Sequence, residues 1–130
     1  MMGFSAVTAH RVVAAPEVLD ASVWPEWSDV LRLAADEALV IHEVGADVVT
    51  PIIDDPFAII EPESGFMESW CDSEWFAARV APHIDWAIPT RPALAQGLVA
   101  GVPCKLRFAD DSVLVLCLTA HVHELKERLG

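Results

Sequence analysis

The sequence predicts one compact domain of the α+β class, with a mostly antiparallel sheet built from β-hairpins and two or more packed helices. Its 130 residues are close to the commonest size of a single domain, and 54% of them are apolar, which predicts a filled core. Short strand-like runs dominate, and two helix-like segments each follow strands, so strand and helix do not alternate as in a parallel sheet. No internal repeat or low-complexity linker divides the chain, and we expect a single domain over residues 1–130.

The first thirty residues predict one strand and one irregular stretch. Residues 4–13 are apolar and partly β-branched, which favours an opening strand. Residues 15–29 contain Pro16 and Pro25, and two prolines this close together favour an irregular connection.

The next segment predicts a β-hairpin. Residues 30–33 and 38–41 are two apolar runs on either side of a short polar stretch, which is typical of a tight turn between two strands. A helix over residues 27–38 is the alternative, because several apolar residues in it share a helical face. The β-branched pair Val40 and Ile41 favours the hairpin.

Two further strands and a helix are predicted in the middle of the chain. Residues 57–60 form an apolar run, residues 63–65 supply a turn, and residues 66–70 alternate apolar and polar side chains, as in a half-buried strand. Asp72 or Ser73 then predicts a helix start, since either side chain can accept hydrogen bonds from the first free N–H groups.

The end of that helix and the segment after it are set by prolines. Pro82 ends the helix early. Residues 90–97 are predicted to form a loop, and residues 98–108 one strand with a bend or an edge at Gly101 and Pro103.

The last third predicts a strand and a final helix. Asp110 and Asp111 form a turn, and residues 112–118 are a strongly apolar strand. Thr119 is predicted to cap a helix, and the apolar residues that follow fall on one helical face.

The charge distribution argues against nucleic acid as a partner. The net charge is −12, and residues 12–78 contain 15 acidic residues against one basic residue, Arg32. Proteins that bind phosphate backbones use basic patches. We interpret the acidic half either as a solvated surface or as a docking face for a basic partner.

The chain is expected to be cytoplasmic, without a membrane segment or a secretory signal. No apolar run approaches the roughly 20 residues that a bilayer-spanning helix needs, and Arg11 interrupts the only candidate for a signal sequence. Three cysteines without a C-x-x-C motif are typical of a reducing compartment.

His121 and His123 form the pattern that most resembles a metal site. Imidazoles are common ligands of zinc and copper, but residues two apart on a helix do not face the same way. We therefore expect two histidines near a helix start and no metal.

Cys104 and Cys117 are predicted to be neighbours on paired strands. If Asp110 and Asp111 form a two-residue turn, the residues on either side of it, 109 and 112, pair with each other. The residue numbers of every further pair then also sum to 221, which places Cys104 opposite Cys117. A disulfide is conceivable at such a position, and two reduced, buried side chains are the interpretation that the compartment favours.

Cys71 precedes the predicted helix start at residue 72, a position that can lower the pKa of a thiol. A nucleophile would also need a base, and His83 is the nearest histidine in the sequence. Nothing in the pattern brings the two together, so a structural cysteine is the expected role.

Pairs of acidic residues fall in predicted turns and indicate no catalysis. These are residues 36–37, 54–55 and 110–111, and turns favour aspartate because its side chain bonds to the local backbone. Glu61 and Glu63 are expected to be loop charges. No dinucleotide, Walker, nucleophile-elbow or zinc-protease motif occurs in the sequence.

Five tryptophans and no tyrosine form an unusual aromatic set. Trp70, Trp75 and Trp86 are predicted to cluster around the central helix. They serve either as core or as an aromatic surface for a partner protein, since tryptophans anchor interfaces.

Several stretches resemble the gamma subunit of heterotetrameric sarcosine oxidase. Residues 31–41, two aliphatic runs around a turn with Asp-Glu, resemble a hairpin of that family. Residues 57–86, a strand, turn and strand that lead into a helix and an apolar-Asp-apolar segment, resemble its next section. Residues 95–103, followed by strand, turn, strand and helix, match best. The resemblance covers residues 30–129.

The resemblance implies an α+β fold like one part of the folate-binding aminomethyltransferase domains. In these oxidases the flavins, NAD and folate belong to the large subunits, and the gamma subunit is an accessory piece. The family usually has a helix between the hairpin and the next strand, whereas residues 43–55 here are too short and too rich in proline for a full helix.

Three functions follow as hypotheses. The first is a non-catalytic accessory subunit that docks to a flavin-dependent, sarcosine-oxidase-like complex or forms a homo-oligomer, with no catalytic, cofactor-binding or metal residues of its own. The second is a stand-alone domain that binds a small, folate-like ligand. The third, a small enzyme that uses Cys71 or the two histidines His121 and His123, has the least support.

Overall fold

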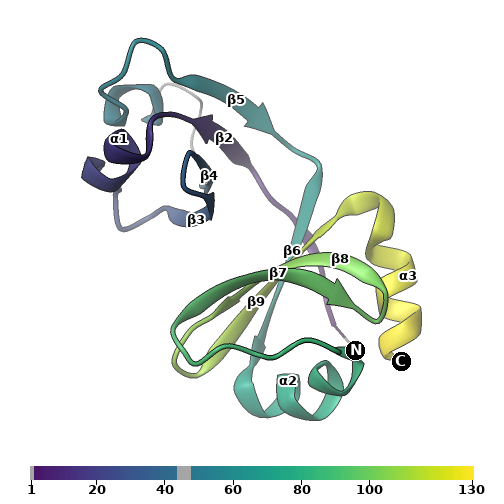
Figure 1. Ribbon diagram of the computed structural model, residues 1–130. Helices are drawn as coiled ribbons and strands as arrows, with labels where there is room; N and C mark the ends of the chain where they lie inside the picture. The colour runs from purple at the N-terminus through teal and green to yellow at the C-terminus, as the bar shows by residue number, and fades with distance from the viewer. Residues whose placement is uncertain (1, 44–47) are drawn as a thin grey trace. The chain divides into compact units, whose positions relative to one another are not determined.

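The computed structural model describes residues 2–43 and 48–130, and its strands and helices confirm the α+β class. The strands pair antiparallel, as predicted, and they form two sheets, one of five strands and one of four (Figure 1). The chain divides into two compact units: unit 1 comprises Met1–Ala6 and Gly65–Gly130, and unit 2 comprises Val7–Ser64. That residues 1–130 form one domain stays a prediction.

Unit 2 contains the four-stranded sheet, and the predicted hairpin is part of it. The strand order is β3 (Asp29–Ala34), β4 (Glu37–Ile41), β2 (Ala9–Val13) and β5 (Ile59–Glu63). Strands β3 and β4 pair antiparallel, with a register shift between Arg32 and Ala34, so the alternative helix over residues 27–38 is wrong. Strand β5 begins two residues later than predicted, because Asp55 Oδ1 accepts a hydrogen bond from the backbone N–H of residue 57 and holds a turn there.

A short helix covers one face of this sheet where an irregular stretch was predicted. Helix α1 (Pro16–Ala21) begins with a proline, and the fixed φ of proline suits the first turn of a helix, whose N–H groups have no intrahelical partner in any case. Its Leu19 is buried in the core of unit 2. The buried members of that core are Val12, Ala14, Leu19, Ala38, Val40, Val49 and Ile53.

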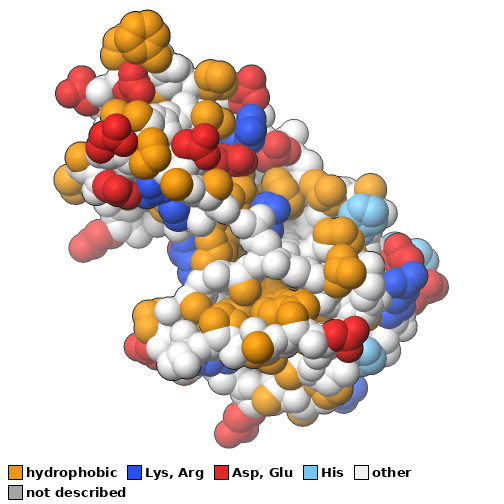
Figure 2. All heavy atoms as spheres, viewed as in Figure 1, with side chains coloured by type: hydrophobic (Ala, Val, Ile, Leu, Met, Phe, Trp, Pro, Cys, Tyr) orange, Lys and Arg blue, Asp and Glu red, His pale blue; other side chains and the backbone are white. Residues whose placement is uncertain are grey.

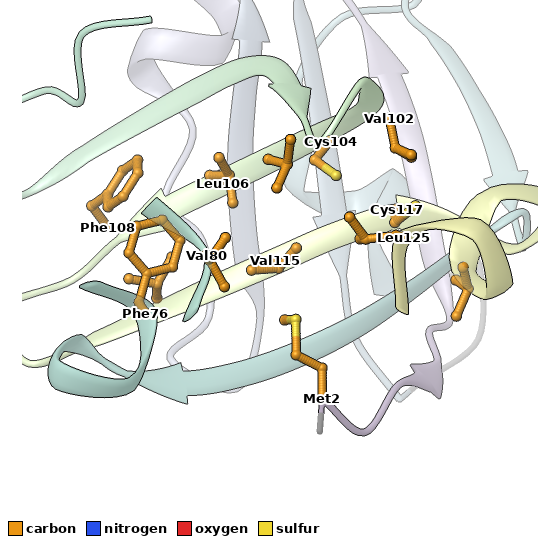
Figure 3. Close-up of a cluster of buried hydrophobic side chains, with 13 residues drawn as sticks. Met2, Phe76, Val80, Val102, Cys104, Leu106, Phe108, Val115, Cys117 and Leu125 are labelled. Carbon is orange, nitrogen blue, oxygen red and sulfur yellow. The ribbon is translucent and has the colours of Figure 1, made fainter. Parts of the chain in front are cut away.

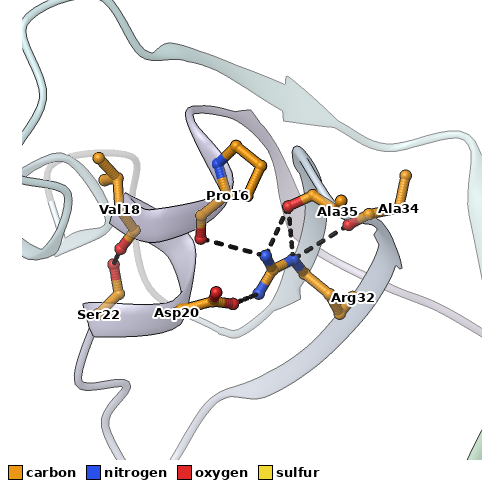
Figure 4. A network of polar contacts seen from close by, with 7 residues as sticks. All are labelled: Pro16, Val18, Asp20, Ser22, Arg32, Ala34 and Ala35. Carbon is orange, nitrogen blue, oxygen red and sulfur yellow. Dashed lines mark hydrogen bonds and ion pairs between the residues drawn. The ribbon is translucent and has the colours of Figure 1, made fainter.

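Arg32 of β3 ties α1 to the hairpin turn (Figure 4). Its Nη1 forms an ion pair of 2.9 Å with Asp20, and its Nη2 donates to the carbonyl oxygen of Pro16. Its Nε donates to the carbonyl oxygens of Ala34 and Ala35 at 3.0 and 3.1 Å. One guanidinium therefore satisfies carbonyl groups at the helix start and in the turn together.

The segment expected to lack a full helix is only partly described. Residues 44–47 of the stretch 43–55 lie outside the described residues. Within the described remainder, Thr50–Ile52 forms a single 3-10 turn, η2.

Unit 1 contains the five-stranded sheet, in the order β1 (Ser5–Ala6), β6 (Phe66–Asp72), β9 (Ser112–Leu118), β8 (Val102–Phe108) and β7 (Ala93–Val99). The predicted loop over 90–97 and the predicted single strand over 98–108 are wrong, because a hairpin turn lies at Ala100 and Gly101. Both residues have positive φ, 50° and 78°, which is the geometry of a tight two-residue turn.

Helix α2 (Ser73–Arg79) begins as predicted. The backbone N–H of Trp75 donates to Asp72 Oδ1 at 2.7 Å, so Asp72 is the N-cap. A 3-10 turn, η3 (Ala81–His83), follows the helix, with Pro82 in its first turn.

Helix α3 (Thr119–Leu129) also follows the prediction, except at its cap. Leu118 occupies the N-cap position without a side-chain hydrogen bond. The hydroxyl of Thr119 instead donates to the carbonyl oxygen of Gly65 at 3.1 Å. The capping role predicted for Thr119 is wrong, because this hydroxyl bonds to the residue before β6.

The core of unit 1 lies between its sheet and its two helices. Figure 3 shows side chains from the strands, from α2 and from α3 converging on one cluster. Phe76 of α2 meets Phe108 of β8 edge to face, with 5.4 Å between the ring centroids. Val122 and Leu125 are the buried residues of α3. In the described part of the chain no helix has the length and apolarity that a bilayer crossing requires.

Candidate functional site

His121 and His123 lie on α3, as the sequence predicts. His123 is exposed, and its Nε2 lies 3.2 Å from Glu127 Oε1, one turn further along the helix. Among residues 2–43 and 48–130, no three His, Cys, Asp or Glu side chains come together in a group that could hold a metal. That the chain binds no metal stays a prediction.

Cys104 and Cys117 lie directly opposite each other on β8 and β9, which confirms the predicted register. Both are buried, and both are free thiols. A hydrogen bond to Cys117, together with burial, raises the pKa of the Cys104 thiol. Neither cysteine is accessible enough to act as a nucleophile, and their reduced state in the cell stays a prediction.

Cys71 has the properties of a structural thiol. Burial, together with the charge of Asp72, raises the pKa of Cys71 to about 11, and the charge of Arg91 opposes this only in part. Its Sγ donates to the carbonyl oxygen of Val113 at 3.7 Å. His83 lies in η3 and is exposed, and no hydrogen bond joins it to Cys71 in the described structure. The position before the helix start therefore does not activate this thiol.

Glu37 of β4 and Glu61 of β5 lie near one arginine. Arg11 of β2 donates to Glu37 Oε2 at 2.9 Å and lies 3.9 Å from Glu61. The hydrogen bond and charge of Glu37 raise the pKa of the Arg11 guanidinium. Glu61 and Glu63 were predicted to lie in a loop, which is wrong, because the register with β2 continues through both residues.

Trp86 is a packing residue of unit 1. It is half-buried, and its Nε1 donates to the carbonyl oxygen of Leu98 at 2.8 Å. A Cβ atom at Gly97 would lie 2.6 Å from that same nitrogen, so the indole needs a glycine beneath it. This tryptophan belongs to the core and not to an open surface.

Trp70 and Trp75 border a pocket of unit 1 with a volume of about 280 Å³. Trp70 is on β6 and is 47% exposed, while Trp75 is in the first turn of α2 and is half-buried. Asp72, the N-cap between them, is the one charged residue of the lining. The lining residues are Met2, Gly3, Ser69, Trp70, Cys71, Asp72 and Trp75.

A second apolar surface of unit 1 follows a cross-strand row. Phe66 pairs with Leu118, and Pro103 pairs with Leu98. These four residues border a pocket of about 250 Å³, and Leu98 is 54% exposed. Unit 1 therefore presents exposed apolar side chains at more than one place.

The buried pair His10 and His42 in unit 2 is a feature that the sequence analysis missed. His10 Nδ1 lies 2.6 Å from His42 Nε2, and the edge of Trp27 meets the ring of His42. His10 is only 4% exposed, and its Nε2 has no hydrogen-bond partner in the described structure. Burial, and then the neighbouring His42, lowers the pKa of His10 below its ordinary value of 6.5. The two histidines are 32 residues apart in sequence, and no local pattern indicates that they meet.

Charge is concentrated in unit 2. Its sequence has twelve acidic and two basic residues, a net charge of −10, whereas unit 1 has eight acidic and six basic residues, a net charge of −2. Figure 2 shows acidic side chains distributed over the visible face of unit 2 and larger hydrophobic areas on unit 1. Most of the acidic residues thus belong to unit 2, whereas the aromatic pocket belongs to unit 1.

The fold is similar to that of solved proteins whose sequences differ widely from this one. A chain of the heterotetrameric sarcosine oxidase from Corynebacterium sp. U-96, in complex with pyrrole 2-carboxylate, superposes with a TM-score of 0.76. The match is 14% identical and covers 98% of this chain and 81% of the other. At that identity the likeness shows the fold alone.

The aspartate kinase of Clostridium acetobutylicum superposes with a TM-score of 0.50 at 8% identity, over 99% of this chain and 34% of the kinase. No family model matches the sequence. No curated protein matches it either.

Proposed function

We propose that this chain is a non-catalytic accessory subunit of a flavin-dependent, sarcosine-oxidase-like complex in the cytoplasm. The observation that carries the proposal is the fold match with a chain of a heterotetrameric sarcosine oxidase, which extends over 98% of this chain and 81% of that one. The match thus extends over about four fifths of the matched chain. The kinase match, in contrast, covers about a third of a larger enzyme.

Exposed aromatic and aliphatic side chains support association with a protein. Trp27, Trp70 and Leu98 are each about half exposed, and Phe57 is 89% exposed. Large apolar side chains at the surface are typical of docking sites when they gather in patches, and tryptophans are enriched among the residues that dominate binding energy.

The chemistry of the candidate residues supports a role without catalysis. A nucleophile needs a lowered pKa or an adjacent base, and the pKa of Cys71 is raised to about 11. Glu37 of β4 and Glu61 of β5 both lie within ion-pair distance of Arg11. These contacts favour structural roles for Cys71, Glu37 and Glu61.

A stand-alone domain for a folate-like ligand is the second candidate function. Pockets for ligands of that size usually enclose 300–1,000 Å³. The aromatic pocket of unit 1 has a volume of about 280 Å³, and a pocket beside α1 in unit 2, with about 340 Å³, has an aliphatic and acidic lining without aromatic rings. A volume below this range in one pocket and a lining without aromatic rings in the other favour docking over enclosure of a folate-like ligand.

The test is affinity capture of the tagged chain from its native cell, followed by mass spectrometry and a flavin spectrum of the captured material. We expect a stoichiometric flavoprotein and a native mass well above that of the 14.2 kDa chain. A chain that stays monomeric and captures no flavoprotein would refute the proposal. Calorimetric titration with 5-formyltetrahydrofolate tests the second candidate function. Micromolar 1:1 binding to the isolated chain would favour a ligand-binding domain over an accessory subunit.

A further inference from the structure

Strand β6 has an open edge beside the aromatic pocket. Strand β1 pairs with β6 only at Met67 and Glu68, so the end of β6 has no partner strand on that side in the described structure. Within unit 1, Met2 and Gly3 line the pocket there without forming a strand. A Cβ atom at Gly3 would meet nothing within 4 Å, so space remains next to this edge.

The backbone groups that face the open edge can be assigned from the pairing with β9. The carbonyl oxygen of Gly65 accepts a hydrogen bond from Thr119, and the N–H of Ser73 donates to Asp111, so odd-numbered residues of β6 direct their backbone groups toward β9. Successive residues of a strand alternate in this direction. Trp70 therefore directs its N–H and C=O groups toward the open edge, and Asp72 directs its N–H there, while the C=O of this N-cap residue is used by α2.

The side chains around this edge suit a cation. An indole face attracts a lysine or arginine side chain, and a carboxylate beside it adds a charge-assisted hydrogen bond. Asp72 Oδ1 already accepts the N–H of Trp75, which fixes the carboxylate in place and leaves its outer lone pairs free for a second donor.

We propose that the edge of β6 and its pocket receive an extended segment of a partner protein, with an arginine or lysine side chain between Trp70 and Asp72. The segment adds a strand beside β6 through the backbone groups of Trp70 and Asp72, a common mode of peptide recognition. This inference rests on the proposed accessory function and names the surface and the chemistry of the partner.

Other occupants fit less well. A pocket of about 280 Å³ accommodates a side chain better than a whole small molecule. A second copy of this chain carries a net charge of −12 and would be repelled, as would any acidic segment. The partner is therefore a different protein with a basic strand-forming segment.

The test is selection from a random heptapeptide library displayed on phage, with the intact chain as bait. We expect the selected peptides to carry a central arginine or lysine between β-branched residues and to bind more weakly at high salt. On binding, the backbone amides of Trp70 and Asp72 should become protected from hydrogen exchange. Selected peptides without a basic residue, or no peptides selected at all, would overturn the proposal.

Two substitutions with matched controls locate the binding. Asp72→Asn keeps a residue that can cap α2 but removes the negative charge. Trp70→Ala removes an exposed aromatic ring. Each substitution should weaken peptide binding by about tenfold or more. Glu74→Gln removes a neighbouring exposed carboxylate, and Trp27→Ala removes a ring of similar exposure in unit 2. Both controls should bind as the original chain does.

The outcomes of these experiments distinguish a failure of this inference from a failure of the proposed function. If Asp72→Asn binds the basic peptides as tightly as the original chain, the cation site is refuted and the peptides bind elsewhere on the acidic surface. If the Trp70→Ala chain still captures a flavoprotein in full amount, the site is refuted while the accessory function stands. Selection of basic peptides at the site without any flavoprotein partner would support the site and refute the accessory function.

Discussion

At the scale of single residues, the His10–His42 pair places two imidazoles against each other in the core of unit 2. The 2.6 Å separation of His10 Nδ1 and His42 Nε2 requires that one nitrogen donates and the other accepts, so at least one of the facing nitrogens is unprotonated. Protonation of both rings would bring two positive charges together in a buried site. Burial beside His42 therefore favours the neutral form of His10 in the folded chain.

We predict that this pair makes the stability depend on pH below about 6.5. Because the folded-state pKa of His10 is lowered from 6.5, the unfolded chain binds its proton first, and the stabilising contribution is complete above that pH and is lost as the pH falls. Urea unfolding between pH 7.5 and 5 should show a steeper loss for the original chain than for His10→Leu. A control, substitution of the exposed His83, should leave the slope unchanged; parallel curves for His10→Leu and the original chain would contradict the assignment.

Cys71 is predicted to react slowly in the folded chain. A rise in its pKa from 9.0 to about 11 lowers the thiolate fraction at pH 8 about 100-fold, and the thiolate is the reactive form. Reaction with a disulfide reagent such as dithionitrobenzoate, followed by absorbance, should be about 100-fold slower for Cys71 than in the chain unfolded in urea. A native rate close to the unfolded rate would show an activated thiol and reopen the enzyme hypothesis.

At the scale of secondary structure elements, the features predicted correctly are those that depend on residues close together in the sequence, such as turns. The turn at Asp110 and Asp111 fixed the register between β8 and β9, because a two-residue turn leaves only one pairing. The hairpin of β7 and β8 was missed, since Ala100 and Gly101 lie inside an apolar run where only the positive φ values reveal a turn. Helix α1 was missed because Pro16 was interpreted as a breaker when it occupies the first turn of a helix.

Arg32 is predicted to be the main polar link between α1 and the hairpin. Arg32→Ala removes the ion pair with Asp20 and the hydrogen bonds to three carbonyl groups, and should lower the free energy of unfolding by about 1–3 kcal/mol. Arg32→Lys keeps the positive charge but lacks the planar guanidinium, so it should recover only part of the lost free energy of unfolding. Denaturant unfolding measures both, with Arg79→Ala, an exposed arginine of α2, as the control. An Arg32→Ala chain with an unchanged midpoint would contradict this role.

At the scale of the whole molecule, the candidate site could be predicted in part. Trp70 and Trp75 were expected near each other because a strand leads through an N-cap directly into a helix, and both border the same pocket. The edge beside them could not be predicted, since it depends on β1 pairing with β6 over only two residues and on a sequence separation of about sixty residues. Long-range pairing also brings His10 and His42 together, and it has no local signature.

The prediction of one domain over residues 1–130 is tested by removing unit 2. Unit 2 is inserted between β1 and β6, two strands that pair with each other at Ala6 and Met67, so Asn-Gly in place of Val7–Ser64 would connect them by a short loop. The remaining 72 residues form a much smaller chain, and chains of that size bury only about 60–65% of their surface on folding, which leaves them marginally stable. We therefore expect the shortened chain to have a much lower Tm than the full chain, and the full chain to unfold in one calorimetric transition. Two separate transitions in the full chain, together with an unchanged Tm for the shortened chain, would show that the two units are independent domains.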